Sequence, residues 1–234
     1  MSFSSSSALV AALSGARWIV GGDSGDLGWR FVDWVYSLSL PREPGELEPA
    51  PEQALRQLRK GGFDVPSFPV VVNTSDGDDA IATEFLAPLK PGPIVAIHPG
   101  AGKARNVWPA ENFARVISAM EAQGKKVWIV EGPADGPVVE RVFELLGSER
   151  PRLANVDLCV VGAALRASDL VLVNDTSVMH LAGAVGARGV AMFGTTPSEI
   201  WAPRTERFVA IQSKTGQMDG ISPEEVLDSL ATFG

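Results

Sequence analysis

Side chains capable of chemistry gather just after the apolar run Asp169–Val173. Asp175 lies at the end of that run, Thr176 and Ser177 follow it, and His180 lies in the first turn of a helix-like run of small residues. Ligands of open α/β sheets bind at the carboxyl ends of the strands, and a helix amino terminus favours anions through its free N–H groups and partial positive charge. We therefore predict a site for a phosphorylated ligand here. The alternative is a capped core helix with an incidental histidine.

The loop after Ile94–His98 adds glycines and positive charge. Glycine lets the backbone approach a ligand closely, and basic side chains supply charge for a phosphate. A glycine turn between a strand and a helix also occurs where no ligand binds, so this loop taken alone fits a structural turn equally well. His98 is predicted to be a hydrogen-bonded structural residue rather than a base. The candidate residues of this loop are Gly100, Ala101, Lys103, Arg105 and Asn106.

Two further turns follow predicted strands. Asp135 comes after Lys126–Glu131, and it could accept hydrogen bonds from a ribose, cap the next helix, or do both. Gly194–Pro197 follows Gly189–Phe193. The carboxyl ends of parallel strands meet at one edge of a sheet, so these loops are expected to converge there. Together they indicate a ligand site more strongly than any of them does separately.

The elements that must position these loops alternate regularly from Pro93 onward. Apolar runs of strand length are separated by stretches with helical apolar spacing, which indicates βαβ units and a mostly parallel sheet. We predict an α/β protein with one complete Rossmann-like domain over residues 91–234. Its predicted strands are Ile94–His98, Lys126–Glu131, Leu170–Asn174 and Gly189–Phe193, with weaker candidates at Arg152–Val156 and Phe208–Gln212. Its predicted helices are Pro109–Gln123, Gly136–Leu146, Leu158–Ala167 and Ser177–Val185.

Residues 1–90 are less regular and are predicted to form an abbreviated amino-terminal α/β domain with a linker. Trp18–Val20 and Val70–Asn73 have the composition of strands, and Pro51–Lys60 that of a helix ended by two glycines. Asp76–Gly92 contains two prolines and ends in glycine, and it is interpreted as the interdomain linker.

Composition narrows the classes of partner. A formal charge of −8 argues against a nucleic acid or an anionic membrane surface as the principal partner. The single cysteine excludes an intramolecular disulfide and suits the cytoplasm. No apolar run approaches the ~18 residues of a membrane span. Two histidines and one cysteine without ligand spacing argue against a structural zinc site, and neither a metal nor a cofactor is expected.

Three motifs occur in a fixed order: HPGA…WP…FA, NDT..MHLA.A.G and MFGTTP…WAP. They occupy His98–Ala101 with Trp108–Pro109 and Phe113–Ala114, then Asn174–Ala184, then Met192–Pro197 with Trp201–Pro203. In order and spacing they resemble glycosyltransferase family 9, the ADP-heptose:lipopolysaccharide heptosyltransferases, from about Ile94 to the end of the chain. The resemblance implies the GT-B architecture, in which two Rossmann-like domains face a cleft. The carboxyl-terminal domain would hold most of the nucleotide-sugar donor.

The resemblance also implies the donor contacts. Backbone N–H groups at the helix start and the imidazole would hold the diphosphate, Gly100 and Ala101 would border it, and Asp135 would lie near the ribose. The residues implied to hold the diphosphate are Asp175, Thr176, Ser177 and His180.

The chain departs from the family pattern in two places. The family usually has a lysine two residues before the Trp-Pro pair, where this chain has Asn106, so Lys103 or Arg105 would have to supply that charge from other positions. No counterpart of the glycine-aspartate turn that carries the family's proposed catalytic base is found. Asp23 and Asp26 follow glycines, but their surroundings fit a later part of the domain, so no catalytic residue is assigned.

The resemblance implies a transferase that moves a heptose or related sugar from an ADP-sugar to a lipopolysaccharide inner-core acceptor, with peripheral membrane contact possible. The absence of an assigned base leaves a second hypothesis open: a catalytically silent nucleotide-sugar-binding module or gene fragment. A nucleotide-sugar epimerase of similar architecture would need acid and base residues that the chain does not reveal.

Overall fold

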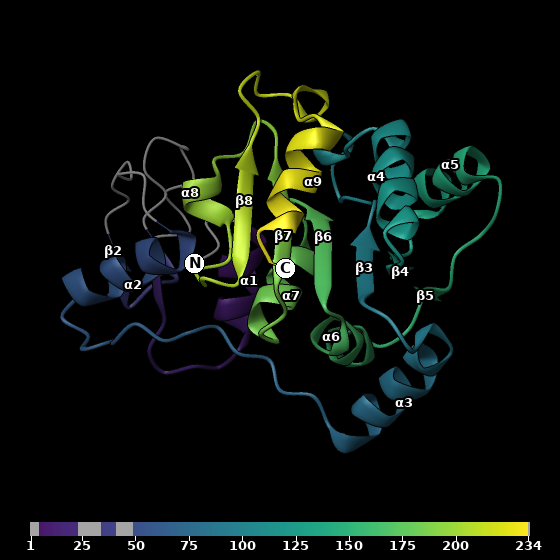
Figure 1. The fold of residues 1–234 in the computed structure, drawn as a ribbon. Helices are drawn as coiled ribbons and strands as arrows, with labels where there is room; N and C mark the ends of the chain where they lie inside the picture. The colour runs from purple at the N-terminus through teal and green to yellow at the C-terminus, as the bar shows by residue number, and fades with distance from the viewer. Residues whose placement is uncertain (1–4, 23–33, 41–48, 234) are drawn as a thin grey trace. The chain divides into compact units, whose positions relative to one another are not determined.

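The computed structural model describes residues 5–22, 34–40 and 49–233. The chain divides into two compact units, residues 1–68 and 69–234, which are considered separately here (Figure 1). In the part of the chain that is described, no helix is long and apolar enough to cross a membrane.

The larger unit contains a six-stranded sheet in which every neighbouring pair is parallel, in the order β5-β4-β3-β6-β7-β8. Every residue of β3, β6 and β7 is buried, as expected for parallel strands covered on both faces. The strands are β3 (Ile94–His98), β4 (Lys126–Glu131), β5 (Arg152–Ala154), β6 (Leu170–Asn174), β7 (Gly189–Phe193) and β8 (Phe208–Gln212).

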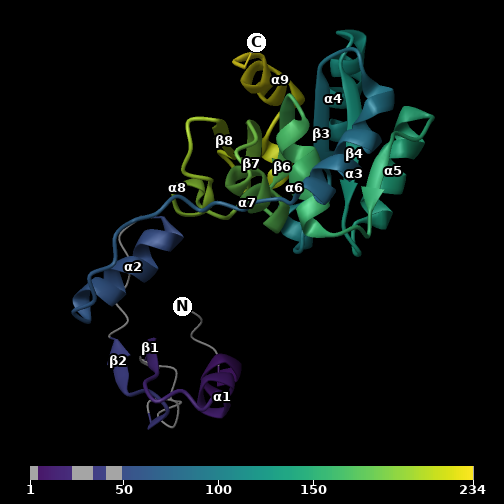
Figure 2. The same ribbon diagram turned by 90° about the horizontal axis from the view of Figure 1, so that it is seen from below.

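Helices cover both faces of this sheet (Figure 1 and, from a second direction, Figure 2). Val95 and Ile97 pack with α4, α5 and α9 on one face, whereas Ile94 and Ala96 pack with α3, α6 and α7 on the other. The helices are α3 (Asp76–Leu86), α4 (Ala110–Ala122), α5 (Gly136–Leu146), α6 (Leu158–Ala167), α7 (Ser177–Ala184), α8 (Ser198–Trp201) and α9 (Pro223–Ala231), with short 3-10 helices η3 (Ala87–Leu89), η4 (Ala104–Asn106) and η5 (Met218–Gly220).

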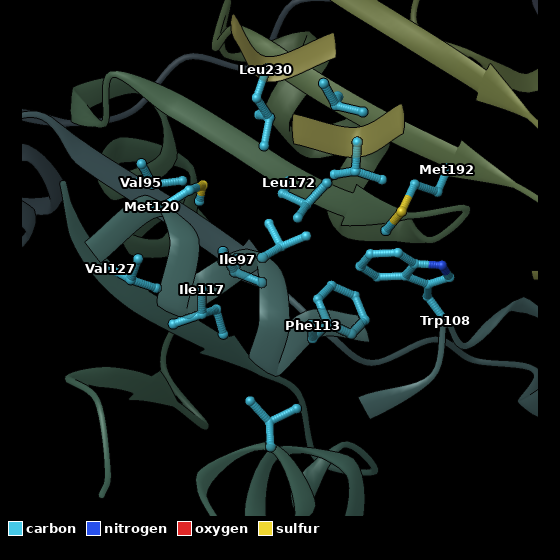
Figure 3. Packing of buried hydrophobic residues seen from close by; sticks show 14 of the residues in the cluster. Val95, Ile97, Trp108, Phe113, Ile117, Met120, Val127, Leu172, Met192 and Leu230 are labelled. Atoms are coloured by element: carbon cyan, nitrogen blue, oxygen red, sulfur yellow. The ribbon is translucent and has the colours of Figure 1, made fainter. Parts of the chain in front are cut away.

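Trp108 fixes the end of the loop that follows β3. Its side chain is fully buried beside Phe113 and Met192 (Figure 3), and its ring meets that of Phe113 edge to face at 5.0 Å. Its indole Nε1–H donates to the carbonyl of Ile221 at 2.9 Å. This hydrogen bond joins the end of the β3 loop to the segment just before α9, and it therefore holds that end of the loop in place.

The predicted strands and helices of residues 91–234 are confirmed to within two residues at each end. The interpretation of Asp76–Gly92 as a linker is wrong for most of its length, because Asp76–Leu86 forms α3. Ser75 caps this helix through a reciprocal capping box with Asp78. Ala82 and Leu86 are buried against the sheet face that α6 also covers, so this segment belongs to the larger unit.

The smaller unit contains α1 (Ser5–Leu13), β1 (Val20–Gly22), β2 (Leu38–Leu40) and α2 (Ala50–Lys60). Strands β1 and β2 pair in parallel, with Val20 opposite Leu38. The helix prediction is confirmed, but the strand predicted at Trp18–Val20 begins only at its last residue, and β2 was not predicted. Residues 70–73 belong to the larger unit, and the strand predicted at Val70–Asn73 does not form there. Val70 and Val71 are exposed. The N–H of Val72 donates to the carbonyl of Ala184, but this hydrogen bond is not part of a sheet.

Candidate functional site

A pocket of about 690 Å³ opens at the carboxyl ends of β3, β6 and β7. It brings the loop after β3 together with the start of α7 and with the turn after β7, as the sequence predicted for parallel strands. Its lining residues are Gly102, Lys103, Arg105, Asn106, Asp175, Thr176, Ser177, His180, Thr195, Thr196, Pro197 and Trp201. Of the residues predicted for the site, Gly100, Ala101 and Asp135 are not among them.

Another depression, of about 630 Å³, lies on the outer surface of α4, α5 and α9. Two of its charged side chains, Arg115 and Glu224, pair with each other at 2.7 Å. Its lining residues all belong to these helices, and none belongs to the loops that follow the strands, where ligands of parallel α/β sheets bind. We therefore place the candidate site at the strand edge.

Helix α7 presents its amino terminus to the pocket. Thr176 is the N-cap: it has extended backbone angles, and its Oγ1 accepts the N–H of Val178 at 3.0 Å. The exposed Ser177 is therefore the first helical residue. The first N–H groups of a helix lack intrahelical partners and carry partial positive charge, so this end of the pocket favours an anion.

A buried chain of hydrogen bonds supports this helix start from behind. His98 Nε2 lies 2.9 Å from Asp135 Oδ2, and His98 Nδ1 lies 3.3 Å from Thr176 Oγ1. All three residues are at least nine-tenths buried. An ionised carboxylate can only accept, so Nε2 carries a proton toward Asp135, and in the neutral ring Nδ1 accepts from the Thr176 hydroxyl. His98 thus has the structural role that was predicted.

Asp135 uses its carboxylate inside this chain. The hydrogen bond from His98 is the main cause that lowers the pKa of Asp135, and a second bond from Gly132 N–H at 2.8 Å acts in the same direction. Asp135 occupies the N-cap position of α5, but its side chain makes no capping bond. Both of these hydrogen bonds end on Oδ2, so Oδ1 is the atom left for the ribose contact, which stays a prediction.

Gly100 is required by the same packing. A Cβ atom at this position would overlap the Asp135 carboxylate. The glycine thus permits the close approach of the β3 loop to Asp135, besides any contact with a ligand.

Asn174 is a structural residue that sequence reasoning did not single out. Its side chain is fully buried and donates from Nδ2 to the carbonyls of Pro99 and Gly100, at 2.9 and 3.0 Å. Its Oδ1 accepts from Trp108 N–H at 3.4 Å. It therefore holds the loop after β3 against the end of β6. A polar residue ending an otherwise apolar strand was the signal that could have revealed it.

Asn106 lies at the floor of the pocket and holds Asp175. Its Nδ2 donates to Asp175 Oδ2 at 2.9 Å and, more weakly, to the Asp175 carbonyl at 3.3 Å. The opposite amide orientation would set its Oδ1 against a carboxylate oxygen, so the orientation is determined by Asp175. Asn106 Oδ1 is buried and has no hydrogen-bond partner among the described residues.

Lys103 and Arg105 contribute positive charge to the rim of the pocket. Both are exposed, and neither forms an ion pair with any residue that the structure describes. Several arginines of the larger unit, by contrast, pair with carboxylates, as Arg150 does with Glu121 at 2.6 Å. Two unpaired cations beside a helix amino terminus form a favourable environment for a phosphate group.

His180 faces the same pocket. Partial burial lowers the pKa of His180, and the negative charge of Asp175 opposes this shift. The imidazole is therefore mostly neutral near pH 7, and an anion bound beside it would favour its protonated form. Its ring lies 6.5 Å from that of Trp201, at an interplanar angle of 64°.

The sequence model of glycosyltransferase family 9, described as heptosyltransferase, matches residues 51–230, which is well over half of the chain. The chain belongs to this family. The resemblance read from the three motifs is thereby confirmed.

Among relatives in glycosyltransferase family 9, the chain is 28% identical over 134 residues to lipooligosaccharide heptosyltransferase 2 of Haemophilus influenzae, a match covering 54% of this chain and 38% of that protein. It is 28% identical over 127 residues to lipopolysaccharide heptosyltransferase 3 of Escherichia coli K12, covering 49% and 35%. These matches span little more than a third of the relatives' length.

Solved structures of this family share the fold. The family 9 glycosyltransferase of Veillonella parvula superimposes with a TM-score of 0.80 at 20% identity, covering 97% of this chain and 70% of that one. ADP-heptose lps heptosyltransferase II of E. coli gives 0.78 at 18% identity, covering 99% and 74%. The predicted GT-B-like α/β fold is confirmed. Asp23 and Asp26, the two aspartates weighed as a base, lie outside the described residues.

Proposed function

We propose that the pocket is the donor site of a glycosyltransferase that moves a heptose or related sugar from an ADP-sugar to a lipopolysaccharide acceptor. One observation carries the proposal. The amino terminus of α7, His180, Lys103 and Arg105 all meet in one pocket at the carboxyl edge of a parallel sheet.

The family relatives supply the ligand chemistry. E. coli heptosyltransferase WaaC has been solved with ADP and with ADP-2-deoxy-2-fluoro heptose, and its fold matches this chain with TM-scores of 0.69 and 0.66. The sequence relatives are named as lipooligosaccharide and lipopolysaccharide heptosyltransferases. An ADP-sugar carries two phosphates, which the positive end of the pocket suits.

In the proposed reaction, an acceptor hydroxyl oxygen forms a bond to the anomeric carbon of the donor sugar. The bond from that carbon to the diphosphate oxygen breaks, and ADP leaves with the electron pair. A base takes the hydroxyl proton. The helix dipole, the rim cations and His180 stabilise the negative charge that develops on the leaving diphosphate. No base is assigned among the described residues.

The test is a thermal-shift measurement with ADP and ADP-heptose. Both ligands are expected to raise the melting temperature of the chain, because a ligand that binds only the folded state stabilises it. His180→Ala is expected to remove most of the shift, whereas Lys125→Ala, a change just before β4 begins and outside the pocket lining, should leave it intact. No shift at millimolar nucleotide would contradict the proposal.

A catalytically silent donor-binding module is the second candidate. Asn106, where the family usually has a lysine, favours it, because a cation near the donor is replaced by a neutral side chain bonded to Asp175. Donor binding without transfer to a heptose-free lipid A–Kdo acceptor would support this candidate. Measurable release of ADP that depends on the acceptor would rule it out.

A further inference from the structure

The two sides of the pocket differ in chemistry. The side formed by the loop after β3 carries Lys103 and Arg105, and the start of α7 lies in the middle. The side formed by the turn after β7 consists of Thr195, Thr196, Pro197 and Trp201, which carry hydroxyl groups and an indole but no charge. In the sheet, β6 lies between β3 and β7, and α7 follows β6. A ligand bound at the start of α7 therefore has the charged rim, Lys103 and Arg105, on its β3 side. On its β7 side it has the neutral rim, formed by Thr195, Thr196, Pro197 and Trp201.

Trp201 stands out on the neutral rim because it is large, apolar and exposed. It retains 42% of its accessible surface, whereas Trp108 and Trp128 in the same unit are fully buried. An apolar side chain left in water at the mouth of a polar pocket gains stability when a ligand covers it.

The segment that carries Trp201 is held in place at several points. Ser198 N–H donates to Gln212 Oε1 at 2.8 Å, and Gln212 Nε2 donates to the Gly194 carbonyl at 2.6 Å. On its other side, Pro203 packs on α7 where Gly183 has no side chain, since a Cβ there would lie 2.7 Å from Pro203 Cβ. The backbone that carries the indole is therefore anchored, which lowers the entropy lost when a ligand stacks on the ring.

We propose that the indole of Trp201 is the surface on which the transferred sugar ring of the donor lies. This inference rests on the proposed function. His180, which would contact the diphosphate, meets the Trp201 ring edge to face, so a ring attached directly to that diphosphate reaches the indole. The face of a pyranose presents C–H groups with partial positive charge, which complement the negative face of an aromatic ring.

The remaining groups on this rim fit a sugar as well. The Thr196 hydroxyl has no hydrogen-bond partner in the described part of the chain, and it can pair with a sugar hydroxyl. The nucleoside is the competing occupant. The family resemblance predicts the ribose contact at Asp135, which follows β4 on the opposite side of β6 from β7. The diphosphate would separate the two rings. The neutral rim on the β7 side is thus left for the sugar.

The experiment compares ADP with ADP-heptose by isothermal titration calorimetry on the full chain. In Trp201→Ala, the Kd of ADP-heptose is expected to rise about five- to tenfold, while the Kd of ADP stays within about twofold. Trp201→Phe keeps an aromatic face and should retain most of the affinity for ADP-heptose. Leu158→Ala, which removes an exposed apolar side chain at the start of α6, is the matched control and should change neither Kd.

A fluorescence measurement keeps the test decisive if Trp201→Ala folds poorly. The emission spectra of the ADP and ADP-heptose complexes should differ in the wild-type chain, and Trp201→Phe should abolish that difference. Three results would overturn the inference: equal weakening of both ligands, which indicates the nucleobase; no effect on either ligand; or equal wild-type affinity for the two. If the wild-type chain binds neither ligand, the proposed function itself fails, and this inference fails with it.

Discussion

The wall behind the pocket and the surface that faces it are built in opposite ways. Behind the pocket, Asn174, His98 and Asp135 are buried and hydrogen-bonded across three loops. On the pocket surface, Lys103 and Arg105 are exposed and lack partners among the described residues. Buried polar groups must be satisfied within the fold, whereas a binding surface keeps its hydrogen-bonding capacity for a ligand. The same strand ends thus carry two sets of residues, one that maintains the shape and one that binds.

The buried residues of the wall should contribute more to the free energy of unfolding than the residues of the pocket surface. Among substitutions in the wall, Asn174→Ala is expected to have the largest effect. The substitution removes three hydrogen bonds and leaves the Pro99 and Gly100 carbonyls without their partner. We expect a loss of about 2–4 kcal/mol in the free energy of unfolding, or roughly 4–16 °C in melting temperature. Urea denaturation measures the loss. An effect below about 0.5 kcal/mol, as expected for the exposed Lys103→Ala, would remove the distinction between wall and surface.

The charged rim should act on binding alone. Replacing Lys103 or Arg105 with Ala is expected to weaken ADP-heptose binding about tenfold each, because under the proposed function each substitution removes a cation beside the diphosphate. The melting temperature of the free chain should not change. Calorimetry at low and high salt measures the effect, and Lys125→Ala provides the same change of charge away from the pocket. If Lys125→Ala weakens binding equally, the effect belongs to the net charge of the protein rather than to the rim.

The smallest effect is expected in the pH dependence of binding, which tests a single residue of the pocket surface, His180. The pKa of His180 is lowered in the free chain, mainly by burial, and a bound diphosphate would raise it. Binding then takes up protons, so the affinity for ADP-heptose should rise as the pH falls from about 8 to about 6, by about threefold. ADP-heptose is preferred to ADP because its diphosphate is fully esterified and does not titrate in this range. His180→Gln should flatten the profile, and an unchanged slope would assign the proton uptake to another group.

Much of the larger unit could be predicted from local patterns. β3, β6 and β7 are short apolar runs whose two faces are both buried, and α4 has apolar residues at helical spacing. The prediction was wrong at α3, where prolines and a glycine after the helix suggested a linker. Ser75 and Asp78 carried the capping signal, but the burial of Ala82 and Leu86 depends on contact with the sheet face that α6 covers.

The site was predicted as a convergence of four loops, and three of them line the pocket, whereas the loop that carries Asp135 does not. The partners of individual side chains could not be predicted. Asp135 was weighed as a ribose ligand or as a helix cap, yet its carboxylate binds His98. The turn at Gly194–Pro197 was noted, and Trp201 was quoted only as part of a motif. No role was predicted for it, because its place beside His180 depends on how Pro203 packs on α7.

The order of apolar runs and glycine turns along the chain was enough to indicate parallel strands, a ligand edge and a preference for an anion. Those features follow from local backbone preferences and from the direction that every parallel strand shares. The hydrogen-bonded pairs within the site join residues far apart in sequence, 37 positions for His98 and Asp135 and 69 for Asn106 and Asp175. Such pairs depend on which strands become neighbours and on how closely the helices pack, and no local propensity encodes either.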